Sequence, residues 1–314
     1  MLLDKREKEM IEFYVIKKEE ALNCTNDKIP ENWIDEYLGH RPGIFDDVDI
    51  FCENIRSKDQ EFKNFSFFQR VDEVKPETVV ICPIYLELYV YGNIMHCIPE
   101  IISYYCEKYK NNKVIFQWNS DNDFVQYNDH VIKYPNCRIL NFNTSSKSNN
   151  DILLPFWVIN TKQYKEKKKY FMGFVGRLNS NTRQTLCDKF RGISDFFCAE
   201  GLSKEDYYKT SSSIIFNLCP KGVGLSSYRF YESFHLNTVP VLLADDSVLP
   251  YEDVNYDDIC IRIEEKYIHN PSYVINILKS TDIDKKLNNI NNIRKRFTLF
   301  GLQEYIHRIL IKEK

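Results

Sequence analysis

The sequence is short of the features that mark several large classes of protein. Glycine and proline are scarce, with 10 and 11 residues among 314, which excludes collagen-like and linker-rich chains. No run approaches the roughly 20 apolar residues that cross a bilayer. The N-terminal stretch is too charged for the core of a signal peptide. We therefore expect a soluble chain in the cytoplasm, without a membrane span.

An excess of charge of one sign is also missing. Lysine and arginine number 42 and the two acidic residues 45, which gives a formal net charge of -3. Proteins that bind nucleic acid usually carry a basic footprint. We therefore expect no nucleic-acid partner. A short basic run at 165–169 is typical of a solvated linker.

Cysteine is present, but not in the patterns that bind metal. None of the 10 cysteines forms a CxxC pair, and none lies at zinc spacing from a histidine. We expect no metal site. Thiols spread along a long chain favour reduced, buried cysteines in a cytosol-like compartment, and a few disulfides are the alternative for an oxidising compartment.

The apolar residues that are present indicate an α/β protein. The continuous run at 78–86 is rich in β-branched residues and predicts a buried strand of a parallel sheet. A helical pattern follows at 94–109, and the first part of the chain is helix-prone, with an amphipathic stretch near Met10–Tyr14. The tail from Ile275 indicates two helical stretches. Further strands are expected at 113–119, 137–143, 151–159, 170–178, 213–220, 238–244 and 258–264.

The alternation of strands and helices restarts after a polar, basic segment at 161–169, which we interpret as a domain boundary. The prediction is a first α/β domain at 1–160 and a second at 161–285. A helical tail at 286–314 is expected to pack back on the first domain. Ligands of such folds bind at the carboxyl ends of parallel strands and in clefts between domains.

One stretch carries most of the predicted chemistry, and it begins with a tight loop at 221–224. Ser226 and Ser227 are suited to open a helix, and a helix N-terminus after a glycine loop favours phosphate oxygens. Arg229 would lie in the first turn, where a cation opposes the helix dipole, so a diphosphate is a good reason for its place. Glu232 falls on the same face and could accept hydrogen bonds from the two hydroxyls of a ribose.

This stretch closely resembles the exostosin-like family of glycosyltransferases. The family pattern has a Pro-x-Gly loop, a Ser-x-Arg-x-x-Glu helix, a Val-Pro-Val strand and an acidic residue before Leu-Pro. Asn237 stands where the family usually has glycine, a swap that a left-handed helix cap tolerates. The matching residues here are Pro220, Gly222, Ser227, Arg229, Glu232, Val239–Val241, Asp246 and Leu249–Pro250.

Three segments upstream extend the resemblance in the family's order. Residues 71–89 are similar to its first buried strand with the segment before it, 151–156 to its domain junction, and 174–183 to its Phe-x-Gly-Arg turn. Together the motifs cover most of 65–265. We therefore identify the chain as a member of this family.

The resemblance implies a GT-B architecture, in which two Rossmann-like domains face each other across a cleft. The second domain would hold a nucleotide-sugar donor and the first the acceptor, and the transfer would invert the anomeric centre without a metal or other cofactor. The residues expected to bind the donor are Arg177, Arg183, Pro220, Gly222, Ser227, Arg229, Glu232 and Asp246.

An inverting transfer needs a general base for the acceptor hydroxyl. Asp121 and Asp123 follow an expected strand where the family often has a His-Asp pair, and Glu87 is the other candidate. The family's histidine is absent, because Asn119 and Ser120 precede Asp121. The same string could instead form a plain turn rich in Asp and Asn. Its Asp-x-Asp pattern is not expected to bind metal, because it lies far from the nucleotide motif.

These observations predict an inverting glycosyltransferase. Its donor would be a UDP-sugar, with xylose as the specific choice, and its acceptor a hydroxyl of an oligosaccharide or glycoprotein. A GDP-fucose fucosyltransferase of the same fold is the first alternative. A non-catalytic subunit that binds nucleotide sugars is the second.

Overall fold

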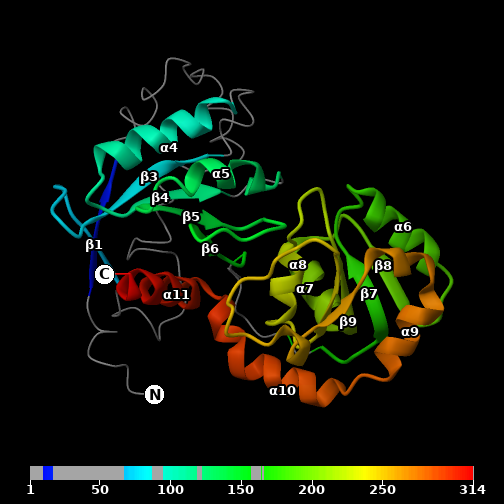
Figure 1. Ribbon diagram of the computed structural model, residues 1–314. Helices are drawn as coiled ribbons and strands as arrows, with labels where there is room; N and C mark the ends of the chain where they lie inside the picture. Colours follow the sequence, from blue (N-terminus) through cyan, green and yellow to red (C-terminus); the bar gives the residue numbers. More distant parts are fainter. Residues whose placement is uncertain are drawn as a thin grey trace. The chain divides into compact units, whose positions relative to one another are not determined.

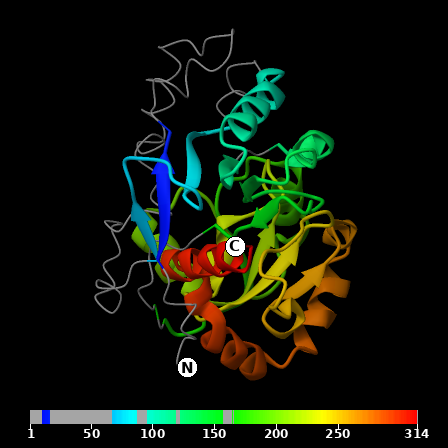
Figure 2. The same ribbon diagram turned by 60° about the vertical axis from the view of Figure 1, so that its left-hand side comes forward.

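The computed structural model describes residues 10–16, 67–86, 95–118, 122–156, 164 and 166–313. These residues divide into two compact units (Figures 1 and 2). Those before 155 form the first unit together with those from 299 onward, and those between 155 and 298 form the second. Each unit is an α/β fold built on one parallel sheet, as the sequence predicts.

The first unit contains a six-stranded sheet in the order β2-β1-β3-β4-β5-β6, and every neighbouring pair is parallel. Its strands β3 and β4 are the buried apolar runs expected from the sequence. The bounds are β1 Ile11–Val15, β2 Phe68–Arg70, β3 Val79–Tyr85, β4 Val114–Trp118, β5 Cys137–Asn141 and β6 Asp151–Leu153.

Helices cover both faces of this sheet. Figure 1 shows α4 (Cys97–Lys108) on one face and α11 (Leu299–Lys312) on the other. The apolar face of α4 packs on the side chains of β3, β4 and β5 that point its way. Between β4 and β5 the chain forms two short helices, η4 (Phe124–Tyr127) and α5 (Asn128–Val131).

The expected helical character near Met10–Tyr14 is wrong, because this stretch is strand β1. Its side chains alternate between buried and half-buried, which is the period of a strand with one face on the core. Phe13 pairs with Arg70 on one side and Val79 on the other. The rest of the predicted N-terminal helical region, at 17–66, lies outside the described residues.

Three α-helices, rather than two helical stretches, follow residue 270. They are α9 (Pro271–Lys279), α10 (Ile283–Ile293) and α11. The last of them belongs to the first unit, where the His307 ring packs on Phe67 at a centroid distance of 5.1 Å. Just beyond α11, Glu313 accepts two hydrogen bonds from Arg138 of β5.

The second unit has a five-stranded parallel sheet in the order β11-β10-β9-β7-β8. Counted along the chain within this unit, the order is 2-1-3-4-5. The direction of winding therefore reverses between β7 and β9. The bounds are β7 Tyr170–Val175, β8 Phe196–Ala199, β9 Ile214–Pro220, β10 Val239–Leu243 and β11 Ile261–Ile263.

Successive side chains of each strand point to opposite faces of this sheet. Phe216 and Leu218 of β9 pack with α6 and α9 in the main apolar core. Asn217, between them, donates a hydrogen bond of 2.8 Å to the Ser233 hydroxyl of α8 on the opposite face. The helices are α6 Asn181–Phe190, α7 Lys204–Ser212 and α8 Tyr228–Ser233.

One residue of the basic segment at 165–169, which the sequence predicts to be a solvated linker, stabilises the fold of the second unit. The ammonium of Lys168 donates hydrogen bonds to three backbone carbonyls, those of Ser212, Ile214 and Asn237. It thereby joins the end of α7, the start of β9 and the turn after α8. Asn237 has a positive φ of 52°, as its predicted role as a left-handed helix cap requires.

The cysteines depart from the expectation of reduced thiols at one pair. Cys187 of α6 and Cys198 of β8 form a disulfide. Disulfides are typical of chains that fold in an oxidising compartment, which was the alternative left open by the sequence. The other described cysteines are buried and form no disulfide with a described residue. Within the described part of the chain, no helix has the length and apolarity to cross a membrane.

Candidate functional site

The carboxyl ends of β7 and β9 bring two predicted donor-binding arginines together. Arg229 is the second residue of α8, and its Nε donates a hydrogen bond of 2.6 Å to the carbonyl of Val175, the last residue of β7. Its guanidinium lies 4.3 Å from the centroid of the Phe174 ring. Only 7% of Arg229 is exposed. These contacts fix a buried cation at the point where the winding of the sheet reverses.

Gly176 explains how this guanidinium fits. A Cβ at position 176 would lie 1.7 Å from Nη2 of Arg229, and the residue has a φ of 153°, which favours glycine. Gly176 therefore provides the space that the arginine fills. The Gly-Arg turn is visible in the sequence, but Gly176 is not among the donor-binding residues predicted from it.

The charge of Arg229 is incompletely compensated within the protein. Its Nη1 is buried and has no hydrogen-bond partner among the residues that the structure describes. A buried cation with an unsatisfied donor is costly, and an anion that binds there removes the cost. The site is therefore prepared for a negatively charged ligand.

Arg183 reaches the same place from the first turn of α6. Its Nη1 donates to the carbonyl of Arg177 at 3.2 Å and to the side chain of Asn179 at 2.7 Å. A Cβ on Gly222 would lie 2.7 Å from Nη2 of Arg183. The guanidinium carbon of Arg183 is 5.9 Å from the same Phe174 ring. Two guanidinium groups thus converge beside the loops after β7 and β9.

The other predicted donor residues around these loops have different environments. Pro220 is buried at the end of β9, and the Arg177 side chain is exposed. Ser227 occupies the N-cap position of α8, but its side chain makes no capping hydrogen bond. Because α8 has only six residues, its N-terminus is a weak source of positive charge. Arginines, rather than the predicted helix end, supply the charge here.

Asp246 lies at the carboxyl end of β10 and is exposed. The neighbouring Asp245 accepts a hydrogen bond of 2.8 Å from the backbone of Glu265. Lys221, in the loop after β9, forms an ion pair of 2.7 Å with Glu265, which raises the pKa of the lysine. The charge of Lys221 is therefore already balanced, unlike that of Arg229.

Glu232 lies one helical turn after Arg229 and has two partners that the sequence did not suggest. The Tyr207 hydroxyl donates to one carboxylate oxygen at 2.5 Å, and the Tyr208 hydroxyl donates to the other at 3.3 Å. Both tyrosines come from α7. No motif links α7 to Glu232, so only the folded structure identifies this contact.

The three predicted base candidates differ in what can be said of them. Asp121 and Glu87 lie outside the described residues. Asp123 caps η4 through the amide of Val125 and accepts two further hydrogen bonds from Ser145 and one from Thr144. These contacts tie the loop after β4 to the loop after β5. At Asp123 they correspond to the turn rich in Asp and Asn, which is the alternative interpretation of this string.

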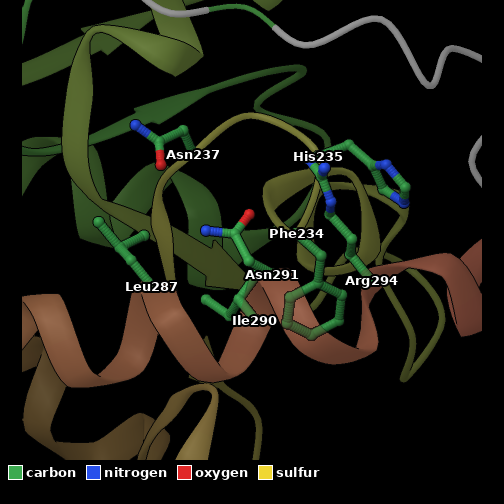
Figure 3. A pocket seen from close by; sticks show the side chains of 7 residues that line it. All are labelled: Phe234, His235, Asn237, Leu287, Ile290, Asn291 and Arg294. Atoms are coloured by element: carbon green, nitrogen blue, oxygen red, sulfur yellow. The ribbon is translucent and has the colours of Figure 1, made fainter.

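A hollow of about 310 Å³ lies in the second unit, at a different place from Arg183 and Arg229. It is formed by the turn between α8 and β10 and by α10 (Figure 3). Asn237, Asn291 and Arg294 give it polar walls. It is at the amino end of β10, whereas Arg183 and Arg229 are at the carboxyl ends of the strands. The hollow is thus not part of the predicted donor site.

Comparison with known proteins places the chain in a family. The pattern of the Exostosin GT47 domain matches residues 107–281, more than half of the chain. A rice protein (Oryza sativa subsp. japonica) named as a probable glucuronosyltransferase is 32% identical over 81 residues, 26% of this chain and 19% of that protein. An Arabidopsis thaliana protein named as a probable beta-1,4-xylosyltransferase is 39% identical over 61 residues, 19% of this chain and 15% of that protein.

The matched stretches cover less than a fifth of the length of these two relatives. Among solved structures, the crystal structure of the GtfA/B complex has a TM-score of 0.45 and 10% identity, over 77% of this chain and 58% of that one. The family pattern covers the loop after β7, the loop after β9 and the whole of α8. The chain belongs to the Exostosin GT47 family of glycosyltransferases.

Proposed function

We propose that the protein transfers a sugar from a UDP-linked donor to a hydroxyl of a glycan, with inversion of the anomeric centre. The observation that carries the proposal is the convergence of Arg183 and Arg229 at the point where the winding of the second sheet reverses. Arg229 has a buried donor that finds no partner within the described part of the chain, and a diphosphate would supply an acceptor for it. Open α/β sheets bind their ligands at this point.

The chemistry follows from these positions. The acceptor oxygen attacks the anomeric carbon, and the bond from that carbon to the diphosphate oxygen breaks. The electron pair leaves with UDP, and the two guanidiniums stabilise the charge that develops on its phosphate. The proton of the acceptor passes to a carboxylate base, which we propose is Asp121 or Glu87. Asp123 is a weaker candidate, because its carboxylate already accepts four hydrogen bonds.

We also propose that the transfer needs no resident metal or other cofactor. Two guanidiniums supply the positive charge that a divalent cation provides in other transferases. Pro220, Gly222 and the Ser227 backbone shape the loop around the diphosphate. Xylose is the proposed donor sugar, and one relative is named for that sugar. The proposed acceptor is an oligosaccharide or a glycoprotein.

A thermal-unfolding panel tests the proposal. The protein is heated with UDP, GDP, CMP or a set of UDP-sugars, each with and without EDTA. A ligand at about 100 times its Kd adds about 2.7 kcal/mol to the free energy of unfolding, which a melting curve resolves. We expect stabilisation by UDP and by UDP-xylose that EDTA does not remove. Release of UDP from UDP-xylose in the presence of xylose-accepting oligosaccharides then tests turnover.

Each other outcome has a defined meaning. Stabilisation by GDP alone would contradict a UDP-sugar donor and favour the GDP-fucose fucosyltransferase. Binding of UDP without turnover on any glycan would support the non-catalytic subunit. Loss of the UDP effect with EDTA would contradict metal independence, and no shift with any nucleotide would contradict the donor site itself.

A further inference from the structure

The contact between α7 and Glu232 has a role beyond packing. Tyr207 and Tyr208 are consecutive residues, yet each hydroxyl reaches a different oxygen of the same carboxylate, at 2.5 Å and 3.3 Å. The carboxylate is therefore held at both ends. Free rotation about the last bond of Glu232 would break both hydrogen bonds.

The surroundings keep the tyrosines protonated and in place. Burial, and then the charge of Glu232, raise the pKa of both hydroxyls, so each remains a hydrogen-bond donor at neutral pH. The Tyr208 ring stacks on Tyr164 at a centroid distance of 5.5 Å, within a small apolar cluster that includes Leu236. The rings are thus fixed before any ligand arrives.

The remaining capacity of Glu232 matches a diol. A carboxylate has about four sites that accept hydrogen bonds, and the tyrosines use one on each oxygen. One site on each oxygen is left. Glu232 is half-buried rather than enclosed, and it follows Arg229 by one helical turn. Two adjacent hydroxyl groups next to a diphosphate, as in a ribonucleotide, fit that arrangement.

We propose that Tyr207 and Tyr208 are positioning residues that aim Glu232 at the 2′- and 3′-hydroxyls of the donor ribose. They thereby make the site selective for ribonucleotides over 2′-deoxyribonucleotides. This inference rests on the proposed function, because it needs a nucleotide beside Arg229. A site built to bond a hydroxyl rejects the analogue that lacks it, since its own acceptor is then left unpaired.

The test compares UDP with 2′-deoxy-UDP by calorimetric titration. We expect the native protein to bind UDP at least about 10-fold more tightly, the size of one hydrogen bond to a charged group. Tyr207→Phe should reduce this ratio several-fold, because it weakens the binding of UDP, which has both hydroxyls, more than that of 2′-deoxy-UDP, which keeps the 3′-hydroxyl alone. Tyr208→Phe should reduce it less, because its bond to Glu232 is longer. Tyr170→Phe, which alters a tyrosine at the other end of β7, is the matched control and should change neither Kd.

A double-mutant comparison separates positioning from general damage. Glu232→Gln should abolish the preference, and adding Tyr207→Phe to it should then change neither Kd further. A melting midpoint close to that of the native protein shows that each variant folds. A merely structural role for Tyr207 would weaken both nucleotides equally.

The contrary outcomes identify which idea fails. If the native protein binds neither nucleotide, the proposed function fails, and the positioning role fails with it. If it prefers UDP and Glu232→Gln removes the preference, but Tyr207→Phe and Tyr208→Phe keep it in full, only the positioning role is overturned. If Glu232→Gln keeps the preference, both the ribose assignment and the positioning role are wrong.

Discussion

At the scale of single residues, Nη1 of Arg229, a buried donor without a partner among the described residues, makes the first prediction. Arg229→Ala should weaken UDP binding by about 10- to 100-fold, because a hydrogen bond between charged groups is lost. The melting midpoint should change little, since the substitution also removes a buried, incompletely paired charge. Calorimetric titration and a melting curve measure the two effects.

Arg191→Ala is the matched control for this prediction. Arg191 is exposed and pairs with Asp188 on the surface, so the variant removes one arginine without touching the site. It should bind UDP as the native protein does. Equal affinity of Arg229→Ala and the native protein would show that the diphosphate lies elsewhere.

The space at Gly176 makes the second prediction. Gly176→Ala places a methyl group where Nη2 of Arg229 lies, so the guanidinium must move away from its position beside Val175 and Phe174. UDP affinity should fall about as far as in Arg229→Ala. Gly201→Ala is the control, because Gly201 also has a positive φ but has nothing within 4 Å of its Cβ position. It should cost stability alone, and a similar loss of affinity there would attribute the effect to backbone strain.

How far the sequence predicts the site depends on how local each contact is. Arg229, Glu232 and Gly222 were predicted as site residues because they share one continuous motif. The tyrosines that hold Glu232 lie about one helix and one strand away along the chain, and nothing local to them signals the contact. The structural role of Asp123 was also open, because its partners come from the loop after the next strand.

At the scale of elements, the disulfide between α6 and β8 makes the third prediction. It closes a loop with a sequence separation of 11, and α6 carries Arg183 at its other end. Cys187→Ser with Cys198→Ser should lower the free energy of unfolding by about 2–3 kcal/mol. Urea unfolding with and without dithiothreitol measures this, since the reductant should lower the native midpoint and leave the double variant unchanged.

A native protein that ignores dithiothreitol in this experiment would contradict the disulfide and favour the reduced thiols expected from the sequence. Cys219→Ser is a useful comparison, because Cys219 is buried but free. The difference in the free energy of unfolding between Cys219→Ser and the native protein should be the same with and without reductant. Mass spectrometry after alkylation reports the oxidation state of the pair directly.

Strands were predicted correctly from the sequence where the apolar run was long and continuous. The apolar runs of β3, β9 and β10 indicate fully buried parallel strands on their own. Strand β1 was misjudged as helix-prone, because a five-residue alternation at the start of a charged segment is too short to outweigh helix propensity. Its identity depends on pairing with β2 and β3, which are more than 50 residues away along the chain.

At the scale of the whole molecule, the two sheets repeat one winding pattern without a repeat in sequence. In the first sheet β1 lies between β2 and β3, and in the second sheet β7 lies between β8 and β9. Each sheet therefore has a point at which the direction of winding reverses. In the second unit the arginines gather there. In the first unit the strand on one side of that point is β3, and Glu87 follows it in the sequence. Of the two proposed bases, Glu87 thus follows a strand beside such a point along the chain, whereas Asp121 follows β4.

The response of the protein to acid makes the last prediction. His235, beside the hollow in Figure 3, is only 4% exposed, and burial together with the charge of Arg294 lowers its pKa from 6.5 to about 4. Above pH 6.5 it contributes nothing to the pH dependence of stability. As the pH falls from 6.5 to 4, the unfolded chain takes up a proton that the folded chain refuses, so stability is lost. By about pH 5 the loss should be about 2 kcal/mol.

Urea unfolding at about pH 7.5 and about pH 5 measures it as the difference between the native protein and His235→Gln, which cancels the titration of other groups. His269→Gln, at an exposed position, should keep the native acid response. If His235→Gln loses as much stability in acid as the native protein, the histidine is charged in the folded state, and the second unit is not the acid-sensitive part of the molecule.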